Sequence, residues 1–257
     1  FGDMTAKELK SKKMKDLSNI QGFPGFIKSL MHEYPEINFR VVDSHTEFNI
    51  KTLPQIVLDE LTAQEKFPEV VYKKQNRFQF DVKAGEVNAN GNAALDLDKD
   101  SVVLVLGGAQ GITPELVPQL SLDYPCTYIL AGRSSQLEDA DKFMSLKTKD
   151  EVRKYLIAEE GMKVPAEIEK RSQVIFKSNQ IGEAIQKIEA AGGKAVYRSV
   201  DAKDSKEFKS FIKYLKNEYG KVDGVIHAAG ILDDKLFADK TWESFENVYL
   251  TKVNPLE

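Results

Sequence analysis

The chain has 257 residues and a mass of 28.9 kDa, enough for one α/β domain with a large core or for one and a half smaller domains. Its composition, with 42% hydrophobic, 30% charged and 9% aromatic residues, argues against disordered, collagen-like and repeat-built classes. The net charge of −4, without a tract of interleaved basic and aromatic residues, argues against nucleic-acid binding, because contacts to phosphates need a basic face.

The front part of the chain is expected to contain helices and short strands. Residues 1–16 are rich in lysine and poor in large apolar residues, which indicates a surface loop or a frayed helix. A helix is expected from Phe23 until Pro35, since the residue before a proline leaves the α region. The further elements predicted here are a strand over 38–43, a helix over 52–64 and two strands over 69–72 and 77–80.

Residues 83–100 are rich in Gly, Asn, Ala and Asp without periodicity, and they mark the best domain boundary. Beyond them, strands and helices alternate, which indicates a parallel, doubly wound sheet. The apolar run SVVLVL (101–106) is typical of a strand buried on both faces. The charged stretch 134–180 is longer than ordinary loops and is interpreted as a helical insertion. The other predicted elements are helix 114–120, strand 127–131, helix 181–191, strand 195–200, helix 205–218 and strand 222–227.

A glycine-rich turn follows strand 101–106 directly. Glycine lets a pyrophosphate approach the backbone N–H groups, and the next helix points its free amides at the anion. Thr113 is expected to be the N-cap, with Pro114 at the first helical position. This context between strand and helix predicts a dinucleotide site, the alternative being a tight turn without a ligand. The predicted contacts are Gly107, Gly108, Ala109, Gln110, Gly111 and Ile112.

The next strand ends in Arg133 and Ser134 rather than in an acidic residue. An acidic side chain would accept from the ribose 2′-OH of NAD, whereas Arg133 with the Ser134 hydroxyl can bind the 2′-phosphate of NADP. The predicted cofactor is therefore NADPH. A solvated surface arginine is the alternative reading of Arg133.

Two later strand ends supply further candidates. Asp201, followed by Ala202, would either bond the adenine edge or cap a turn. After His227, the small residues Ala228, Ala229 and Gly230 would let a flat ring or a ribose lie against the backbone. His227 itself is interpreted as structural.

Other kinds of site are not indicated. No apolar run approaches the roughly 18 residues of a membrane span, and the first residues lack a signal-peptide pattern. Cys126 is the only cysteine, so no intrachain disulfide can form. The histidines His32, His45 and His227 lack metal-ligand spacing, so no metal is predicted. We expect a soluble, cytoplasmic protein with neither a membrane nor a nucleic acid as partner.

These motifs resemble the short-chain dehydrogenase/reductase superfamily, and within it the ketoreductase domains of type I polyketide and polyunsaturated fatty acid synthases. Leu106 and Thr113 depart from the superfamily pattern, which usually has Thr before the first glycine and a third glycine. Similar segments run through almost the whole chain: GFPGFIKSLMHEYPEINFRVVD (22–43), EKFPEVVYKKQNRFQF (65–80), GGAQGIT (107–113), AGRSS (131–135), VPAEIEK (164–170), VDAKD (200–204), HAAG (227–230) and ILDDKLFADKTWESFENVYLTKV (231–253).

The resemblance implies an α/β fold in two parts. Residues 97–257 would be an NADPH-binding catalytic subdomain, a Rossmann-like doubly wound parallel sheet with the insertion at 134–180. This subdomain is expected to be incomplete at its C-terminus. Residues 1–96 would be the C-terminal part of a truncated, cofactor-free Rossmann-like structural subdomain, followed by a linker.

The resemblance also implies an activity: NADPH-dependent reduction of a β-ketoacyl thioester on an acyl carrier protein to the β-hydroxyacyl thioester, beside neighbouring domains of a multidomain synthase. Lys252 fits the lysine that holds the ribose and lowers the pKa of the catalytic tyrosine. That tyrosine, its asparagine and the serine would follow Glu257, so this chain alone is expected to lack them. Leu232, Asp233 and Asp234 match the motif of ketoreductases that give the D-configured hydroxyl.

Two other functions remain open from the sequence. The chain could be a structural scaffold whose Rossmann-like part binds nucleotide weakly or not at all. It could also be a stand-alone NADPH-dependent carbonyl reductase, although the leading segment of about 95 residues argues against this.

Overall fold

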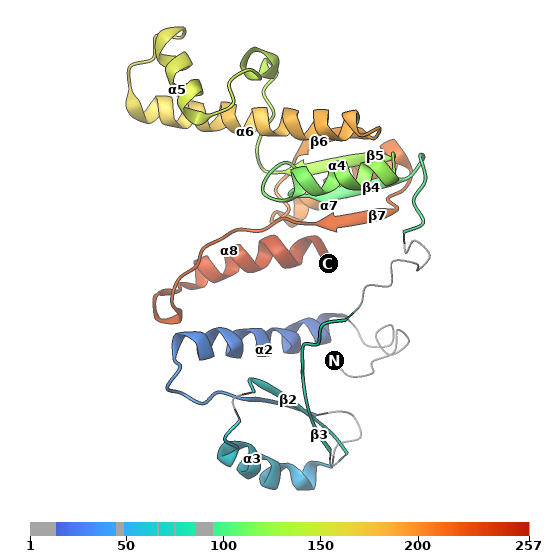
Figure 1. Cartoon of the computed structure of the whole chain (residues 1–257), viewed down its shortest axis with the longest axis vertical. Helices are drawn as coiled ribbons and strands as arrows, with labels where there is room; N and C mark the ends of the chain where they lie inside the picture. Colours follow the sequence, from blue (N-terminus) through green and yellow to red (C-terminus); the bar gives the residue numbers. More distant parts are fainter. Residues whose placement is uncertain (1–13, 45–48, 66, 75, 86–94, 257) are drawn as a thin grey trace. The chain divides into compact units, whose positions relative to one another are not determined.

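The computed structural model describes residues 14–44, 49–65, 67–74, 76–85 and 95–256 (Figure 1). The chain divides into two compact units. Unit 1 comprises Phe1–Asn90 with Lys235–Asp239, and unit 2 comprises Gly91–Asp234 with Lys240–Glu257. The loop or frayed helix expected over 1–16 lies almost wholly outside the described residues.

Unit 1 contains a three-stranded sheet of mixed direction, in the order β1-β2-β3. Strand β1 pairs in parallel with β2, and β2 pairs antiparallel with β3. Its small core joins Ile56 to Val70 and Tyr72 of β2. The elements are α2 (Met14–Glu33), β1 (Val41–Ser44), the 3-10 turn η1 (Ile50–Thr52), α3 (Leu53–Thr62), β2 (Glu69–Lys73), β3 (Asn76–Gln79) and the 3-10 turn η3 (Phe237–Asp239).

A buried carboxylate, Glu60 of α3, joins three parts of unit 1. It is 6% exposed and accepts hydrogen bonds from Tyr72 Oη at 2.7 Å, from Arg77 Nε at 2.5 Å and from Arg40. Burial opposes its ionisation, but the hydrogen bonds outweigh burial and lower the pKa of Glu60 to about 2. Burial and the bond to Glu60 raise the pKa of Tyr72 to about 12, so Tyr72 remains a donor.

The segment Lys235–Asp239 belongs to unit 1 although it follows most of unit 2 in the sequence. The N–H of Phe237 donates a hydrogen bond to Glu33 Oε2 at 2.6 Å. The Phe237 ring packs edge-on against Phe26 of α2, with ring centroids 5.5 Å apart. The chain therefore returns to unit 1 after the last strand of the second sheet.

Unit 2 is built on a four-stranded parallel sheet in the order β6-β5-β4-β7. This is the order of the first four strands of a doubly wound dinucleotide-binding sheet, and it confirms the predicted fold class. The strands are β4 (Val102–Leu106), β5 (Thr127–Gly132), β6 (Lys194–Ser199) and β7 (Gly224–His227). The helices are α4 (Thr113–Asp123), α5 (Lys149–Ala158), α6 (Pro165–Ala190), α7 (Ser205–Tyr219) and α8 (Trp242–Val253), with 3-10 turns η2 (Ala140–Phe143) and η4 (Asn254–Leu256).

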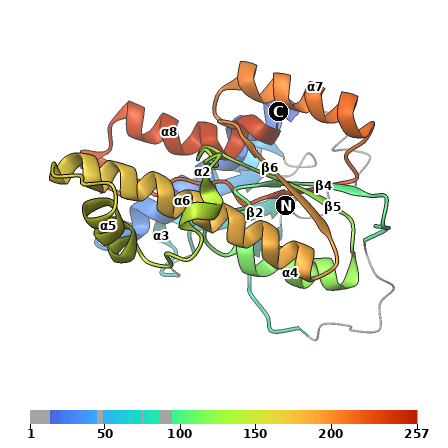
Figure 2. The same ribbon diagram turned by 90° about the horizontal axis from the view of Figure 1, so that it is seen from above.

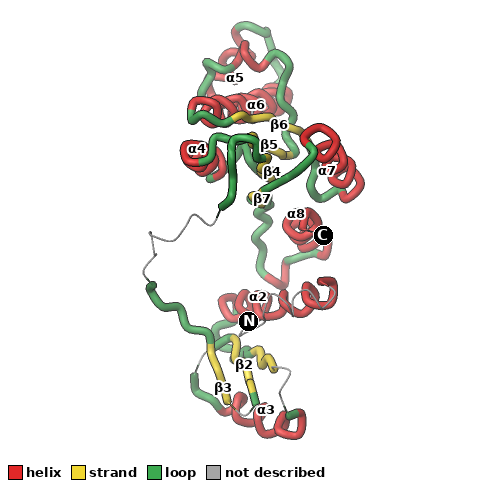
Figure 3. Tube along the Cα trace, turned by 90° about the vertical axis from the view of Figure 1, so that its right-hand side faces the viewer, coloured by secondary structure: helices red, strands yellow, loops and turns green. Residues whose placement is uncertain are grey.

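Helices cover both faces of this sheet (Figure 3). Val103 and Val105 of β4 lie in the core that α4 and α6 contribute to, whereas Val102, Leu104 and Leu106 pack in the core with α7. All five residues of β4 are buried. Full burial of each Val or Leu side chain contributes about 1.5–3 kcal/mol, so the continuous apolar run is a large share of the core of unit 2.

The end of the insertion and the helix that covers the sheet form one continuous helix. The sequence predicts a separate helix over 181–191. Helix α6 begins at Pro165 and runs unbroken to Ala190, with α5 packed beside its first half (Figure 2). Three buried positions on α6 are occupied by the polar residues Ser172, Ser178 and Asn179. The buried face of the helix is therefore not marked by a continuous apolar pattern in the sequence. The insertion has its own core, made of Phe143, Val152, Leu156, Ile168 and Ile175.

Gly107 allows the loops after β4 and β7 to touch. Its φ is +77°, and a Cβ there would lie 2.8 Å from the carbonyl oxygen of Ala228 and 2.9 Å from the nitrogen of Ala229. Gly111 also has a positive φ, of +71°, but a Cβ there would meet nothing within 4 Å. Both positions favour glycine because of their left-handed backbone conformation. Gly107 is also needed because a Cβ there would collide with the backbone of the loop after β7.

We predict that Gly107→Ala destabilises unit 2 by about 2 kcal/mol more than Gly111→Ala. Both variants carry the cost of a left-handed alanine, but only Gly107→Ala adds a collision with backbone atoms. Hydrogen exchange of the β4 amides measures the free energy of opening. Equal losses in the two variants would show that the contact with Ala228 is not tight.

We predict that Glu60→Gln destabilises unit 1 by about 3 kcal/mol at pH 7, because Arg40 and Arg77 lose their buried partner. A carboxylate with a lowered pKa stabilises the fold fully above its unfolded pKa, near 4.5, and loses this effect as the pH falls towards 2. Protection of the β2 amides should therefore fall across this range in the wild type and change little with pH in Glu60→Gln. The exposed control Glu36→Gln should behave as the wild type. If Glu60→Gln loses protection at low pH as much as the wild type does, the acid sensitivity of unit 1 does not come from Glu60.

Candidate nucleotide-binding site

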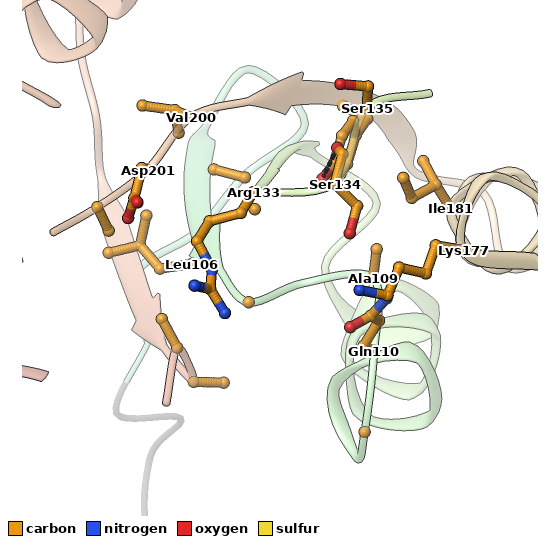
Figure 4. A pocket seen from close by; sticks show the side chains of 18 of the residues that line it. Leu106, Ala109, Gln110, Arg133, Ser134, Ser135, Lys177, Ile181, Val200 and Asp201 are labelled. Atoms are coloured by element: carbon orange, nitrogen blue, oxygen red, sulfur yellow. Dashed lines mark hydrogen bonds between the residues drawn. The ribbon is translucent and has the colours of Figure 1, made fainter. Parts of the chain in front are cut away.

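A pocket of about 710 Å³ lies at the carboxyl end of the parallel sheet (Figure 4). It is lined by the residues that follow β4, β5, β6 and β7. The strand order reverses here, because β5 and β6 lie on one side of β4 and β7 lies on the other. Ligands of open α/β sheets bind in the crevice at such a switch point.

The pocket brings together most of the predicted cofactor contacts. Gly108 and Ile112 are not among its lining residues. Gly108 is buried, and a Cβ there would lie 2.8 Å from Leu130 Cδ2, whereas Ile112 is 83% exposed. The predicted residues that do line the pocket are Gly107, Ala109, Gln110, Gly111, Arg133, Ser134, Asp201, Ala202, Ala228, Ala229 and Gly230.

The start of α4 differs from the prediction by one residue. Ile112 is the N-cap, and Thr113 is the first residue of the helix. The side chain of Thr113 is buried. The prediction that Thr113 caps the helix is therefore wrong. The open space beside Gly111 still leaves the backbone of the turn accessible from the pocket.

The loop after β5 is held by Tyr197 of β6. Its hydroxyl donates a hydrogen bond to the carbonyl oxygen of Ser134 at 2.7 Å. Burial raises the pKa of Tyr197 to about 12, so the hydroxyl keeps its proton at neutral pH. This bond fixes the backbone that presents the side chains of Arg133 and Ser134.

The charged side chains of the pocket are Arg133, Lys177 and Asp201. Asp201 Oδ1 accepts a hydrogen bond from the N–H of Lys203 at 3.0 Å, so this carboxylate caps a turn while it lines the pocket. Among the described residues, neither Arg133 nor Lys177 has a hydrogen-bond or ion-pair partner for its side chain. Two unpaired cations around one pocket favour an anionic ligand.

Lys252 lies beside the pocket rather than in its lining. A Cβ at Gly230 would lie 3.5 Å from Lys252 Nζ, so the ammonium group faces a residue of the pocket wall. Nε2 of His227 lies 2.8 Å from the carbonyl oxygen of Lys252. His227 thus joins the end of β7 to the last turn of α8.

The structure does not bring Leu232, Asp233 and Asp234 to the pocket lining. Leu232 is 91% exposed, and the carbonyl oxygen of Asp233 accepts a hydrogen bond from Lys240 Nζ at 3.2 Å. These residues lead from β7 into the segment that belongs to unit 1.

Sequence reasoning missed the wall that α6 gives to the pocket. Gln173, Val174, Lys177 and Ile181 line it from this helix, and Thr251 lines it from α8. The spacing of Gln173, Lys177 and Ile181 by four residues is a signal of one helix face, but it crosses the assumed boundary at residue 180.

Other chemistry finds no support in the described parts of the chain. No three His, Cys, Asp or Glu side chains gather there as a metal site requires. None of the helices within 14–44, 49–65, 67–74, 76–85 and 95–256 has the length and apolar character needed to cross a membrane. Cys126 is buried as a free thiol.

Curated proteins similar to this chain are large synthases. The chain is 33% identical over 173 residues to a polyunsaturated fatty acid synthase polypeptide of Thraustochytrium sp., a match that covers 63% of this chain and 6% of that protein. It is 27% identical over 158 residues to the polyketide synthase PksM of Bacillus subtilis, covering 62% of this chain and 3% of that protein. The chain thus spans only a small part of these relatives.

Solved structures share the fold. An N-terminal ketoreductase from the macrolactin assembly line matches with a TM-score of 0.57 and 20% identity, over 91% of this chain and 39% of that one. A-type ketoreductases from a modular polyketide synthase match with a TM-score of 0.60 and 16% identity, over 91% of this chain and 41% of that one. The family model described as "KR domain" matches residues 101–257, more than half of the sequence. The chain belongs to the KR domain family.

Proposed function

We propose that this chain is a β-ketoacyl reductase domain of a multidomain polyketide or polyunsaturated fatty acid synthase. It reduces a β-ketoacyl thioester, held on an acyl carrier protein, to the β-hydroxyacyl thioester with NADPH. Residues 97–257, apart from the segment Lys235–Asp239 that returns to unit 1, form the cofactor-binding subdomain, and residues 1–96 are the end of the structural subdomain with a linker. The observation that carries the proposal is the pocket that gathers the glycine turn, Arg133 and Ser134 at the switch point of the sheet.

The residues present fit a nicotinamide dinucleotide. The open space at Gly111 and the start of α4 suit the pyrophosphate, because backbone N–H groups and the helix dipole favour an anion there. Arg133 and Ser134 suit a 2′-phosphate, and the small residues Ala228 to Gly230 leave room for a ribose against the backbone. NADPH, when bound, supplies the hydride for the reduction.

Lys252 is the catalytic residue that this chain contributes. Its ammonium group, next to Gly230, can donate hydrogen bonds to the ribose hydroxyls at the end of the pocket. A cation at this place lowers the pKa of a nearby phenol by favouring its ionised form. The contact between His227 and the Lys252 carbonyl supports the last turn of α8 against β7.

The stereochemical outcome is a separate part of the proposal. Leu232, Asp233 and Asp234 match the motif of reductases that give the D-configured hydroxyl. Its support is the sequence motif, since these residues lie outside the lining of the pocket.

We predict that Arg133→Ala weakens NADPH binding to this chain by about 10- to 100-fold and leaves NADH binding within about twofold, because a charge-assisted pair with the 2′-phosphate is lost. Arg133→Lys should give an intermediate affinity for NADPH, since lysine keeps the charge and loses the planar fork. Fluorescence titration with both nucleotides at one salt concentration measures this. If wild-type chain binds neither nucleotide, unit 2 is a scaffold and the proposed function fails.

We predict that the full-length natural protein that contains this sequence consumes NADPH when it is given a β-ketoacyl thioester on its carrier protein. In the same protein, Lys252→Met should lower kcat by about 100-fold. Without this cation the pKa of the proton-donating phenol rises, so the alkaline limb of the kcat profile should move to higher pH. Chiral analysis should find the D-configured alcohol; the L-alcohol would contradict the assignment of Leu232 to Asp234. Binding of NADPH without turnover would contradict the catalytic proposal.

A further inference from the structure

The insertion contributes a rigid wall to the nucleotide pocket. Residues 165–180 extend α6 by about 24 Å at the N-terminal side of the part that covers the sheet. Ile168 and Ile175 anchor this extension in the core of the insertion, while Ile181 and Ile188 anchor the following turns in the core beneath the sheet. One unbroken helix therefore contributes residues to both cores.

Lys177 lies on the turn of α6 between the two cores. It is half-buried and lines the pocket with Gln173 and Ile181, four residues before and after it. Its neighbours are fixed: Ser178 Oγ accepts a hydrogen bond from the N–H of Leu137 at 2.9 Å, and Asn179 Nδ2 donates to the carbonyl oxygen of Phe143 at 2.7 Å. The backbone of Lys177 is thus held in place before any ligand binds.

Three other lysines on or beside this helix have carboxylate partners, whereas Lys170 is exposed and has none among the described residues. Lys147 pairs with Glu183 at 2.7 Å, Lys149 pairs with Glu169 at 3.4 Å, and Lys187 pairs with Glu115. Lys177 has no such partner within the described part of the chain, and its side chain and that of Arg133 extend into the pocket from opposite sides (Figure 4). Two cations that face one space without a counter-ion repel each other unless an anion lies between them.

We propose that Lys177 is the second cation of the 2′-phosphate subsite, so that the insertion helps to select NADPH over NADH. This inference rests on the proposed function. A phosphate monoester carries a charge of about −1.5 to −2 at pH 7, more than Arg133 alone neutralises. The amides of the glycine turn and of α4 can hold the pyrophosphate, which leaves Lys177, in the lining of the same pocket as Arg133 and Ser134, free for the second phosphate.

The test compares Lys177→Gln with Lys170→Gln, which removes an exposed lysine from the same helix outside the pocket. Dissociation constants are measured for NADPH and NADH, and for the fragments 2′,5′-ADP and 5′-AMP. Lys177→Gln should weaken NADPH and 2′,5′-ADP about tenfold and leave NADH and 5′-AMP within about twofold. Lys177→Arg should retain most of the NADPH affinity, and Lys170→Gln should match the wild type.

Other outcomes overturn the inference. Equal losses for NADPH and NADH would assign Lys177 to the pyrophosphate or to the fold, and no loss would remove it from the site. In both cases wild-type chain still binds NADPH and the proposed function stands. Wild-type chain that binds no dinucleotide overturns the proposed function itself, which separates the two failures.

Discussion

The architecture of unit 2 depends on the complete burial of strand β4. With parallel strands on both sides and helices on both faces, β4 is accessible only at its ends, and its carboxyl end borders the pocket. The register pairs Leu106 with Ala131 on one side and with His227 on the other, so the three following loops leave the sheet at one level. Gly107 lets the first of these loops turn at once, within contact of Ala228. The pocket is a consequence of that register.

Most of this arrangement could be predicted from the sequence. A continuous apolar run such as 101–106 indicates a strand that is buried on both faces of a parallel sheet. The carboxyl ends of parallel strands meet at one edge of the sheet. The glycine turn, Arg133, Asp201 and the small residues after His227 were therefore expected together, and all of them except Gly108 and Ile112 of the turn line one pocket. The wall from α6 was not expected, because its buried positions include Ser172, Ser178 and Asn179, whose burial depends on hydrogen bonds made after the chain folds.

Unit 1 shows a different limit of sequence reasoning. Its helices and strands follow local patterns, and the strand expected over 38–43 appears only slightly later, at Val41–Ser44. The ionised state of Glu60 could not be predicted, because its donors Arg40, Tyr72 and Arg77 come from separate parts of the chain. A glutamate on a helix is ordinarily a solvated charge, and only the assembled unit makes this one an internal anion.

The return of the chain to unit 1 sets an order of events on the ribosome. Glu33 and Phe237 are 204 residues apart, and at ordinary translation rates this separation corresponds to about 10–40 s. Throughout that interval α2 lacks the aromatic ring and the backbone N–H that later pack against it. Unit 1 therefore stays incomplete until the segment after β7 has been synthesised, and its assembly is timed by elongation through β4 to β7.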